Sequence, residues 1–311
     1  LDGESTRVRS GGFPSVVTKI KELRSENPNS LTLHAGDATN GTLYFTLFDG
    51  EADAALMNSV CFDAFVVGNH EFNNGDEGLA TFLDFLKEGS CQTPVLGANV
   101  QPEVGVSPLA KSSADDYIQP YTVVERNGEK VGIIGVVISK KTKMSSNPDD
   151  TTMFLDEVTT AQKYADELKA QGVDRVILLS HYGYDNDLAL AQKTSGIDII
   201  VGGDSHSLLG DLSNLGLNPN GSYPTMVSDA SGNDVCVVTA WQYSQVVGEL
   251  HAEFDGQGNI TSCMGTPHMM LADSFKRKNA DGERVEIEEG YRDAVYSVIK
   301  GNPSLSIVEP D

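Results

Sequence analysis

Four short polar motifs in the sequence carry side chains of the types that bind divalent metals. Each motif follows an apolar run, and in chain order they contain Asp37, Asn69 with His70, His181, and Asp204 with His206. Carboxylate and amide oxygens are hard ligands, and imidazole nitrogens suit Zn, Mn or Fe. A single Asp or Asn after a strand is more often a turn former than a ligand. The joint occurrence of four such motifs favours a metal site over four unrelated turns.

Alternating strands and helices must position these motifs. Apolar runs predict strands at 30–35, 63–67, 93–99, 129–137, 175–179 and 197–201, and helical spacing predicts helices at 15–24, 51–60, 78–87 and 160–171. Asp76 is expected to cap the helix at 78–87. Apolar strands that alternate with helices predict an α/β sheet covered on both faces, with the site at the carboxyl ends of its strands.

The pattern changes in the last quarter of the chain. Consecutive strands are expected at 235–241, 245–254 and 260–263, and they would add antiparallel strands to a sandwich. A last helix is expected at 289–299, and the segment from 302 onward is predicted as a linker. Histidines outside the four motifs are expected to be structural or exposed, namely His34, His251 and His268. Trp241 is expected in the core or at the rim of the site.

The overall charge limits the classes of partner. The chain has 45 acidic and 22 basic residues, which gives a formal net charge of −23. Such a field repels nucleic-acid backbones, so no nucleic-acid polymer is expected as a partner. A small anionic substrate would need local positive charge, which bound metal ions can supply. No apolar run approaches the roughly 20 residues of a membrane-spanning helix, and no span is expected.

The four cysteines are Cys61, Cys91, Cys236 and Cys263, and none belongs to a CxxC motif. This spacing does not suggest a zinc ribbon or a redox motif. The even number permits two disulfides, and Cys236 and Cys263 flank a strand-rich segment whose ends could meet. Buried free thiols are the alternative, and the sequence leaves both open.

In their order and their residues, the four motifs resemble those of the calcineurin-like metallophosphoesterases. These motifs are Gly36-Asp37 with Gly41-Thr42, Gly68 to Phe72, Ser180-His181 with Gly183, and Gly203 to His206. The closest similarity is to the branch of 5'-nucleotidases and UDP-sugar hydrolases, through Gly68 to Phe72, Thr93 to Asn99, Gly196 to Gly203, and Val247-Gly248 through Phe254-Asp255. The resemblance covers nearly the whole chain and implies a four-layer α/β/β/α sandwich with mixed sheets over residues 1–301. Residues 302–311 would then begin a linker to a separate C-terminal substrate-binding domain.

The resemblance also implies a role for each residue of the motifs. The family binds two divalent metals, and by motif match the ligands would be Asp37 as the bridge, Asn69, His181 and Asp204 on one metal, and His206 on the other. His70 would be catalytic rather than a ligand, because it would donate to the phosphoryl or leaving oxygen as charge builds up there. Asn69 and His70 would both contact the substrate. Glu71 would orient the loop.

Three departures from the family pattern bear on this site. The Asp-x-His motif that would precede the first helix is not found in the sequence. We expect it either ahead of Leu1 in the full protein or missing from a degenerate site, so that the chain as given holds one metal well and the other poorly. Asp204 stands where the family usually has His, which shifts the metal preference toward Mn, Mg or Ca. Asn73 stands where an Asp often pairs with the catalytic histidine, which predicts weaker orientation of His70.

The resemblance implies an enzyme that hydrolyses phosphate esters. The expected substrates are nucleoside monophosphates or nucleotide sugars, the expected cofactors are two divalent ions chosen from Zn, Mn, Mg and Ca, and the expected location is the periplasm or the cell exterior. Two other interpretations stay open. One is a non-catalytic or single-metal relative that only binds, and the other is a broader phosphodiesterase or phosphatase on the same fold.

Overall fold

A six-stranded sheet forms one of the two strand layers at the centre of the molecule. The computed structural model describes residue 3, residues 5–41 and residues 43–310. The strands of this main sheet lie in the order β11 (Thr225–Ser228), β12 (Asp234–Thr239), β10 (Ile199–Gly202), β9 (Arg175–His181), β7 (Glu129–Val137) and β6 (Tyr121–Arg126). The four inner strands are parallel, and the edge strands β6 and β11 are antiparallel to their neighbours, so the sheet is mixed.

A second layer of strands packs against the main sheet. It contains the parallel strands β2 (Leu33–His34), β3 (Ala64–Val66) and β4 (Val95–Leu96), and the long antiparallel pair β13 (Val246–Phe254) and β14 (Ile260–Lys278). Val66 and Leu96 from this layer pack with Ile133, Leu179 and Ile199 of the main sheet in one buried cluster. The two layers therefore share a core that contains no helix, as in a β/β sandwich.

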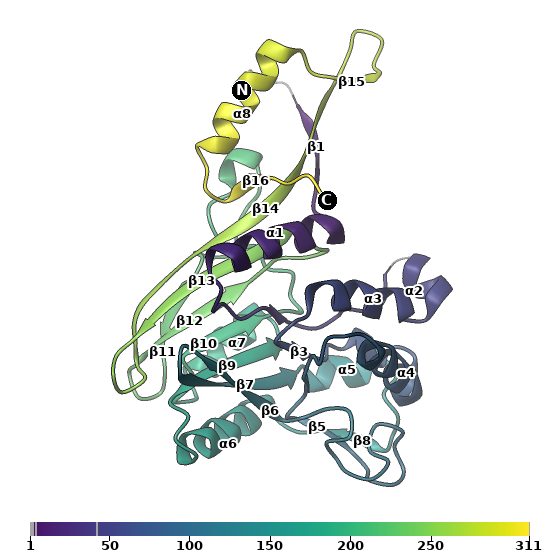
Figure 1. Ribbon diagram of the computed structural model, residues 1–311, viewed down its shortest axis with the longest axis vertical. Helices are drawn as coiled ribbons and strands as arrows, with labels where there is room; N and C mark the ends of the chain where they lie inside the picture. Colours follow the sequence, from purple (N-terminus) through teal and green to yellow (C-terminus); the bar gives the residue numbers. More distant parts are fainter. Residues whose placement is uncertain (1–2, 4, 42, 311) are drawn as a thin grey trace.

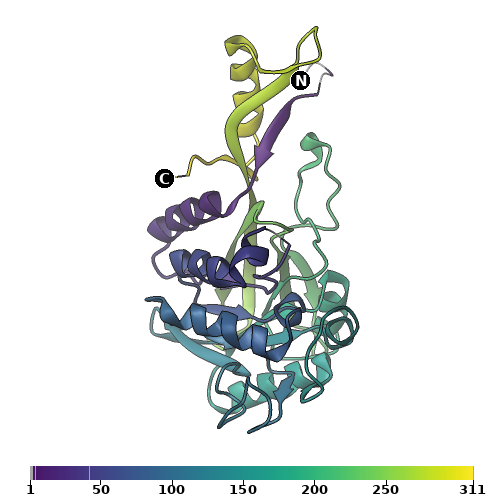
Figure 2. The same ribbon diagram turned by 90° about the vertical axis from the view of Figure 1, so that its right-hand side faces the viewer.

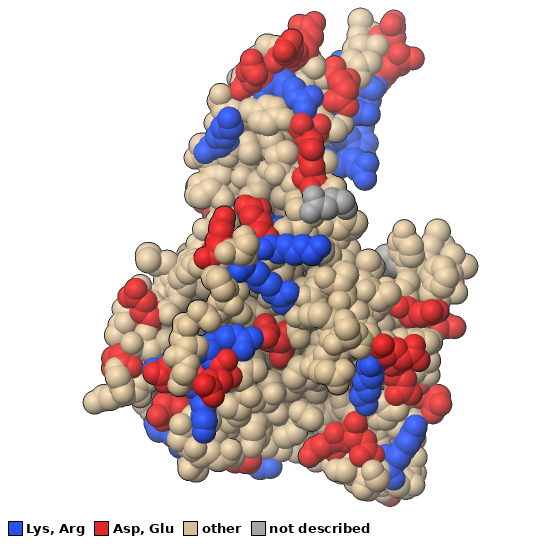
Figure 3. Space-filling view, in the orientation of Figure 1, with Lys and Arg blue, Asp and Glu red and all other residues tan. Residues whose placement is uncertain are grey.

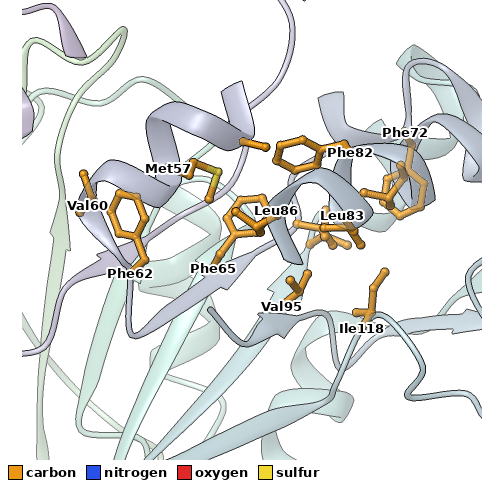
Figure 4. Close-up of a cluster of buried hydrophobic side chains, with 14 of the residues drawn as sticks. Met57, Val60, Phe62, Phe65, Phe72, Phe82, Leu83, Leu86, Val95 and Ile118 are labelled. Atoms are coloured by element: carbon orange, nitrogen blue, oxygen red, sulfur yellow. The ribbon is translucent and has the colours of Figure 1, made fainter. Parts of the chain in front are cut away.

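Helices cover both outer faces of these two layers (Figures 1 and 2). The second layer is covered by α1 (Phe13–Glu26), α3 (Glu51–Val60) and α4 (Gly75–Glu88), and the main sheet by α6 (Glu157–Ala170) and α7 (Tyr184–Ala191). Figure 4 shows Phe65 of β3 among Met57 of α3 and Phe82 and Leu86 of α4. The order of the layers is α/β/β/α, which confirms the predicted fold class.

The second half of β14 runs out of the sandwich and carries a smaller lobe (Figure 1). This lobe contains β1 (Arg7–Ser10), β15 (Arg284–Glu286), α8 (Glu289–Lys300) and β16 (Leu305–Ile307). Its apolar side chains, among them Phe275, Ile299 and Leu305, form a cluster that also includes Leu208, Leu212 and Val246 from outside the lobe. Within the segment predicted to begin a linker at residue 302, β16 pairs in parallel with Met269 to Leu271 of β14.

Short elements complete the described part of the chain. They are α2 (Leu43–Phe48), a 3-10 turn at His70–Phe72, β5 (Val100–Pro102), α5 (Ser139–Ser145), β8 (Thr152–Phe154) and a 3-10 turn at Ser213–Leu215. No helix among the described residues is long and apolar enough to cross a bilayer. On the face shown in Figure 3, acidic and basic side chains are interspersed and no continuous basic patch forms.

Asp76 is not the helix cap that its position in the sequence predicts. Helix α4 begins at Gly75, and Asn74 takes the cap position. Asp76 is fully buried, and its carboxylate accepts hydrogen bonds from the Ser107 hydroxyl (2.8 Å) and from the Asp149 backbone N–H (3.1 Å). The carboxylate therefore links the first turn of α4 to two later loops. The distant donors it accepts from outnumber the single backbone N–H group that a helix cap would satisfy.

All four cysteines are paired. Cys61 is bonded to Cys91 with a Cα–Cα distance of 5.2 Å, and Cys236 to Cys263 with 6.5 Å. Of the two possibilities that the sequence leaves open, the structure thus contains the disulfides. The second bond joins β12 of the main sheet to β14 of the second layer and so links the two layers of the sandwich. His34 packs edge-on against Phe62 and Phe65, as predicted for a structural histidine.

Candidate active site

Four of the predicted site residues meet at the carboxyl ends of parallel strands. His181 is the last residue of β9, and Asp204 lies two positions after the end of β10. Asp37 lies three positions after β2, and Asn69 three positions after β3. The edges of both sheet layers therefore contribute to one site, because parallel strands end on the same side of a sheet.

Two glycines allow the strand-end turns to approach each other closely. Gly36 has a φ of 91°, and a Cβ atom there would lie 2.4 Å from His181 Nδ1. A Cβ atom on Gly68 would lie 2.3 Å from Asp37 Oδ1. Neither position has room for a side chain, so the site requires glycine at both.

Asp37 and His181 form the centre of the site. Asp37 Oδ1 accepts a hydrogen bond from the His70 backbone N–H (2.9 Å), and Oδ2 lies 3.0 Å from His181 Nε2. On the other side of the ring, His181 Nδ1 lies 2.6 Å from the Ala35 carbonyl oxygen and donates to it. A histidine that gives its Nδ1 proton to a carbonyl keeps the Nε2 lone pair for a ligand.

Electrostatics couple the same two side chains. Burial alone would lower the pKa of His181, but the neighbouring carboxylate of Asp37, the Ala35 carbonyl and Asp204 raise this pKa to about 9. Burial would raise the pKa of Asp37, but His181 and the backbone N–H of His70 hold it below its usual value. Each shift has its main opposing cause in the close contact between the His181 ring and the Asp37 carboxylate.

Buried polar atoms without a partner test whether the site suits a metal. Asn69 is 0% exposed, and neither its side-chain oxygen nor its nitrogen makes a hydrogen bond. His181 Nε2 faces Asp37 but has no well-aligned hydrogen bond. Native proteins leave few buried polar atoms unsatisfied, and a role as metal ligand is one reason for such exceptions. The amide oxygen of Asn69, the imidazole of His181 and the carboxylate of Asp37 therefore fit a divalent metal.

Asp204 and His206 differ in their distance from the centre of the site and in their exposure to solvent. Asp204 Oδ1 lies 3.7 Å from His181 Nε2 and forms an ion pair with Lys141. His206 is exposed, and its ring lies against that of Tyr243 at a centroid distance of 5.2 Å. Among the described residues, no three carboxylate, imidazole or thiolate side chains are arranged so that one ion could bind all of them. The structure thus brings Asp204 to the site and leaves His206 at its rim.

Two asparagine side chains orient the His70 ring. The side-chain amide nitrogens of Asn40 and Asn73 each lie 3.0 Å from His70 Nδ1. Two amide donors require Nδ1 to be the acceptor, which places the ring proton on Nε2. Asn73 therefore orients the ring by donating a hydrogen bond to Nδ1, whereas an Asp at this position would accept a hydrogen bond from the ring. Sequence reasoning missed Asn40, whose only signal was its position in the loop that follows Asp37.

Glu71 holds the loops of the site together. Its buried carboxylate accepts hydrogen bonds from the backbone N–H groups of Asp37 (2.9 Å), Thr39 (3.0 Å) and Gly68 (2.5 Å). Burial and the nearby charge of Asp37 raise the pKa of Glu71, while these N–H groups oppose the rise. The carboxylate joins the turn after β2 to the turn after β3, which is the orienting role expected for it.

Replacing Glu71 with glutamine should destabilise the protein without removing any apolar contact. The amide keeps one acceptor oxygen and turns an NH2 group toward backbone donors, so we expect the free energy of unfolding to fall by about 2–3 kcal/mol. Urea denaturation measures this change. Glu77→Gln is the matched control, because Glu77 is an exposed acidic residue in the next helix, and it should change stability by less than about 0.5 kcal/mol. Equal midpoints for the two variants would contradict the role assigned to Glu71.

The chain is similar in sequence to known proteins. Residues 9–208 match the family model described as calcineurin-like phosphoesterase. The chain is 44% identical to a probable 5'-nucleotidase of Treponema pallidum over 97% of this chain. It is 41% identical to the NAD 5'-nucleotidase of Haemophilus influenzae over 100% of this chain. It spans 50% of the length of each of these relatives. A snake venom 5'-nucleotidase of Naja atra is 38% identical over 84% of this chain and is covered over 48% of its own length.

Solved structures give the same grouping. The Haemophilus influenzae NAD nucleotidase superposes with a TM-score of 0.92 at 40% identity and covers 100% of this chain and 60% of its own. The 5'-nucleotidase precursor of Thermus thermophilus gives 0.78 at 36% identity, with 94% of this chain and 54% of its own covered. Both the sequence and the fold are thus shared with proteins named as nucleotidases. The chain belongs to the calcineurin-like phosphoesterase family, whose members typically use divalent metals.

Proposed function

We propose that the protein to which this chain belongs is a metal-dependent hydrolase of nucleotides, with 5'-nucleotidase activity on nucleoside monophosphates as its main reaction. One observation carries the proposal. Asn69 and His181 present buried donor atoms without partners beside the Asp37 carboxylate, and His70 points a ring held by two amides into the same edge of the sheet. The similarity to relatives named as 5'-nucleotidases supports the choice of substrate.

Each residue of the site has a task that its contacts permit. Asp37, Asn69 and His181 would hold a divalent metal, and Asp204 and His206 are further candidate ligands that the described structure does not bring onto the same ion. The metal would polarise the phosphoryl oxygens and activate the attacking water. The His70 ring carries its proton on Nε2 and can donate it as a hydrogen bond to an oxygen on which negative charge develops. Asn40 and Asn73 keep the ring in that orientation from the Nδ1 side.

The ligand types bear on the identity of the metal. Three of the four strand-end ligands bind through oxygen, which favours Mn, Mg or Ca, whereas His181 also suits Zn. We infer a preference for Mn over Zn from this balance. Location outside the cytoplasm is a further part of the proposal, because two disulfides are typical of proteins in oxidising compartments.

Hydrolysis assays on the full-length protein test the proposed function. With Mn or Zn added, AMP should be hydrolysed at least ten times faster, by kcat/KM, than a cyclic nucleotide, and a chromogenic phosphate monoester should be a slower substrate. Removal of metal with a chelator should abolish all three reactions, and added Mn should restore them. Lack of hydrolysis by the full-length protein would contradict the enzyme assignment and favour a relative that only binds. Preference for the cyclic nucleotide would favour a phosphodiesterase.

NAD is the second candidate substrate. The observation that favours it is the superposition, with a TM-score of 0.92, on the Haemophilus influenzae NAD nucleotidase. NAD contains a pyrophosphate linkage, whose hydrolysis needs the same metal-assisted attack on phosphorus. Release of AMP and its further conversion to adenosine in the same assay would show that one site handles both bonds. If NAD is stable while AMP is consumed, the protein is a nucleoside monophosphatase alone.

A further inference from the structure

One lysine reaches the proposed active site from an element that carries none of the predicted ligands. Lys141 belongs to α5, and its ammonium group forms an ion pair with Asp204 Oδ1. The same oxygen lies 3.7 Å from His181 Nε2. The Asp204 side chain is 9% exposed, whereas that of Lys141 is 42% exposed. The Lys141 side chain therefore extends from the buried Asp204 carboxylate toward solvent.

Helix α5 is anchored at both ends to the loops that carry the site. Before its start, the Ile138 backbone N–H donates to the carbonyl of His181 (2.8 Å), and the Ser139 N–H donates to the buried Glu157 (2.6 Å). Beyond its end, Asn147 donates from its backbone to Phe72 (3.1 Å) and from its side chain to Asn73 (2.8 Å). The helix thus spans the gap between the His181 strand and the His70 loop, and its position is fixed relative to both.

The negative charge of the chain and of the site favours a lysine at this position. The chain carries a net charge of −23, and the site itself contains Asp37, Asp204 and the buried Glu71. A phosphate monoester brings further negative charge, about −2 near neutral pH. Lys140, Lys141 and Lys143 lie within one helical turn of α5, and of the three only Lys141 contacts a predicted site residue in the described structure. A cation fixed beside the ligands lowers the repulsion that an incoming phosphate meets.

We propose that Lys141 is a substrate-binding residue whose ammonium group, which lies beside Asp204, pairs with the phosphate of the nucleotide. This inference rests on the proposed function, since it assigns a further group to the same site. A metal ion on the Asp204 carboxylate would compete with the ammonium group for Oδ1, and the flexible stem of lysine allows it to turn to a phosphate oxygen. Lys141 then acts on the affinity for phosphate and has no part in the transfer of protons.

Four variants of the full-length protein test this role. Lys141→Ala should raise KM for AMP and the Kd of inorganic phosphate for the Mn-loaded protein about tenfold, as expected for loss of one charge-assisted contact. The value of kcat should change less than about threefold, because the lost contact is uniform in the ground and transition states. Lys141→Arg should recover most of the affinity. Lys141→Met, which keeps the apolar stem, should behave like the alanine variant, and Lys140→Ala is the matched control from the same helix.

Calorimetric titrations with Mn and with phosphate distinguish the proposal from a role in holding the ligands. We expect the Kd of Mn to stay the same or to fall in Lys141→Ala, because a competing cation has been removed from Asp204. Weaker Mn binding together with unchanged phosphate binding would overturn the proposal and assign Lys141 to positioning Asp204. Unchanged phosphate affinity in an active enzyme would refute the inference while leaving the proposed function intact. Loss of hydrolysis in the unmodified protein would instead refute the proposed function.

Discussion

Replacing His70 with alanine should lower kcat for AMP hydrolysis by about 10²–10⁴-fold and leave the metal content unchanged. The ring lies beside the ligand cluster and contacts Asn40 and Asn73 through Nδ1. The backbone N–H of His70 donates to Asp37. Alanine keeps the backbone N–H, so Asp37 stays in place. The variant loses the ring, and with it the Nε2 proton that would stabilise the transition state and the Nδ1 contacts with Asn40 and Asn73. Steady-state kinetics and elemental analysis of the dialysed full-length protein measure the two quantities.

A control for this change is available in another histidine of the same chain. His251 is exposed and contacts Glu249 on β13, so His251→Ala removes an imidazole without touching the strand-end motifs. Its kcat should stay within about twofold of the unmodified protein. If His70→Ala lost its metal as well as its activity, His70 would be a ligand, and the division of roles between it and Asn69 would be wrong.

The local parts of this site follow from the sequence because each is written in consecutive residues. The strand predicted at 175–179 continues as β9 to His181, and the helix predicted at 51–60 has the bounds of α3. A short apolar run that ends in Gly-Asp or Gly-Asn-His predicts a strand, the turn that follows it and the polar side chain at that turn. Because the strands are parallel, these polar side chains then lie at one edge of the sheet. The order of the four layers, in contrast, was predicted from the resemblance of these motifs to a known family and not from any local pattern.

Contacts between distant segments could not be predicted in this way. Strand β14 was expected to end at Cys263, but it continues to Lys278 through Gly265 and Pro267, two residues that disfavour a strand interior. Pairing with β13, β1, β15 and β16 supplies the hydrogen bonds that override this preference. Polar contacts across the site have the same origin. Asn40 reaches His70, and Lys141 reaches Asp204, from segments 30 and 63 positions away, and no local pattern marks either residue.

The second large effect is expected from His181, the residue on which the metal site depends most. Replacing it with alanine should weaken Mn binding by at least about 100-fold and reduce hydrolysis to the level of the metal-free protein. His181 contributes the only imidazole among the four residues that meet at the strand ends, and its Nε2 lies 3.0 Å from Asp37 and 3.7 Å from Asp204. Without it, the carboxylates of Asp37 and Asp204 would have no imidazole ligand beside them.

Destabilisation must be separated from loss of the ligand, because the His181 side chain is 2% exposed. His268→Ala provides the comparison, since His268 is also buried and pairs with a carboxylate, Glu249, but lies on β14 away from the strand-end motifs. Both variants should unfold at lower temperature. Only His181→Ala should lose metal, and excess Mn should restore part of its activity because Asp37 and Asn69 remain. If the two variants retained metal equally, the ion would not be bound at the end of β9, and the site would have to be sought around His206 instead.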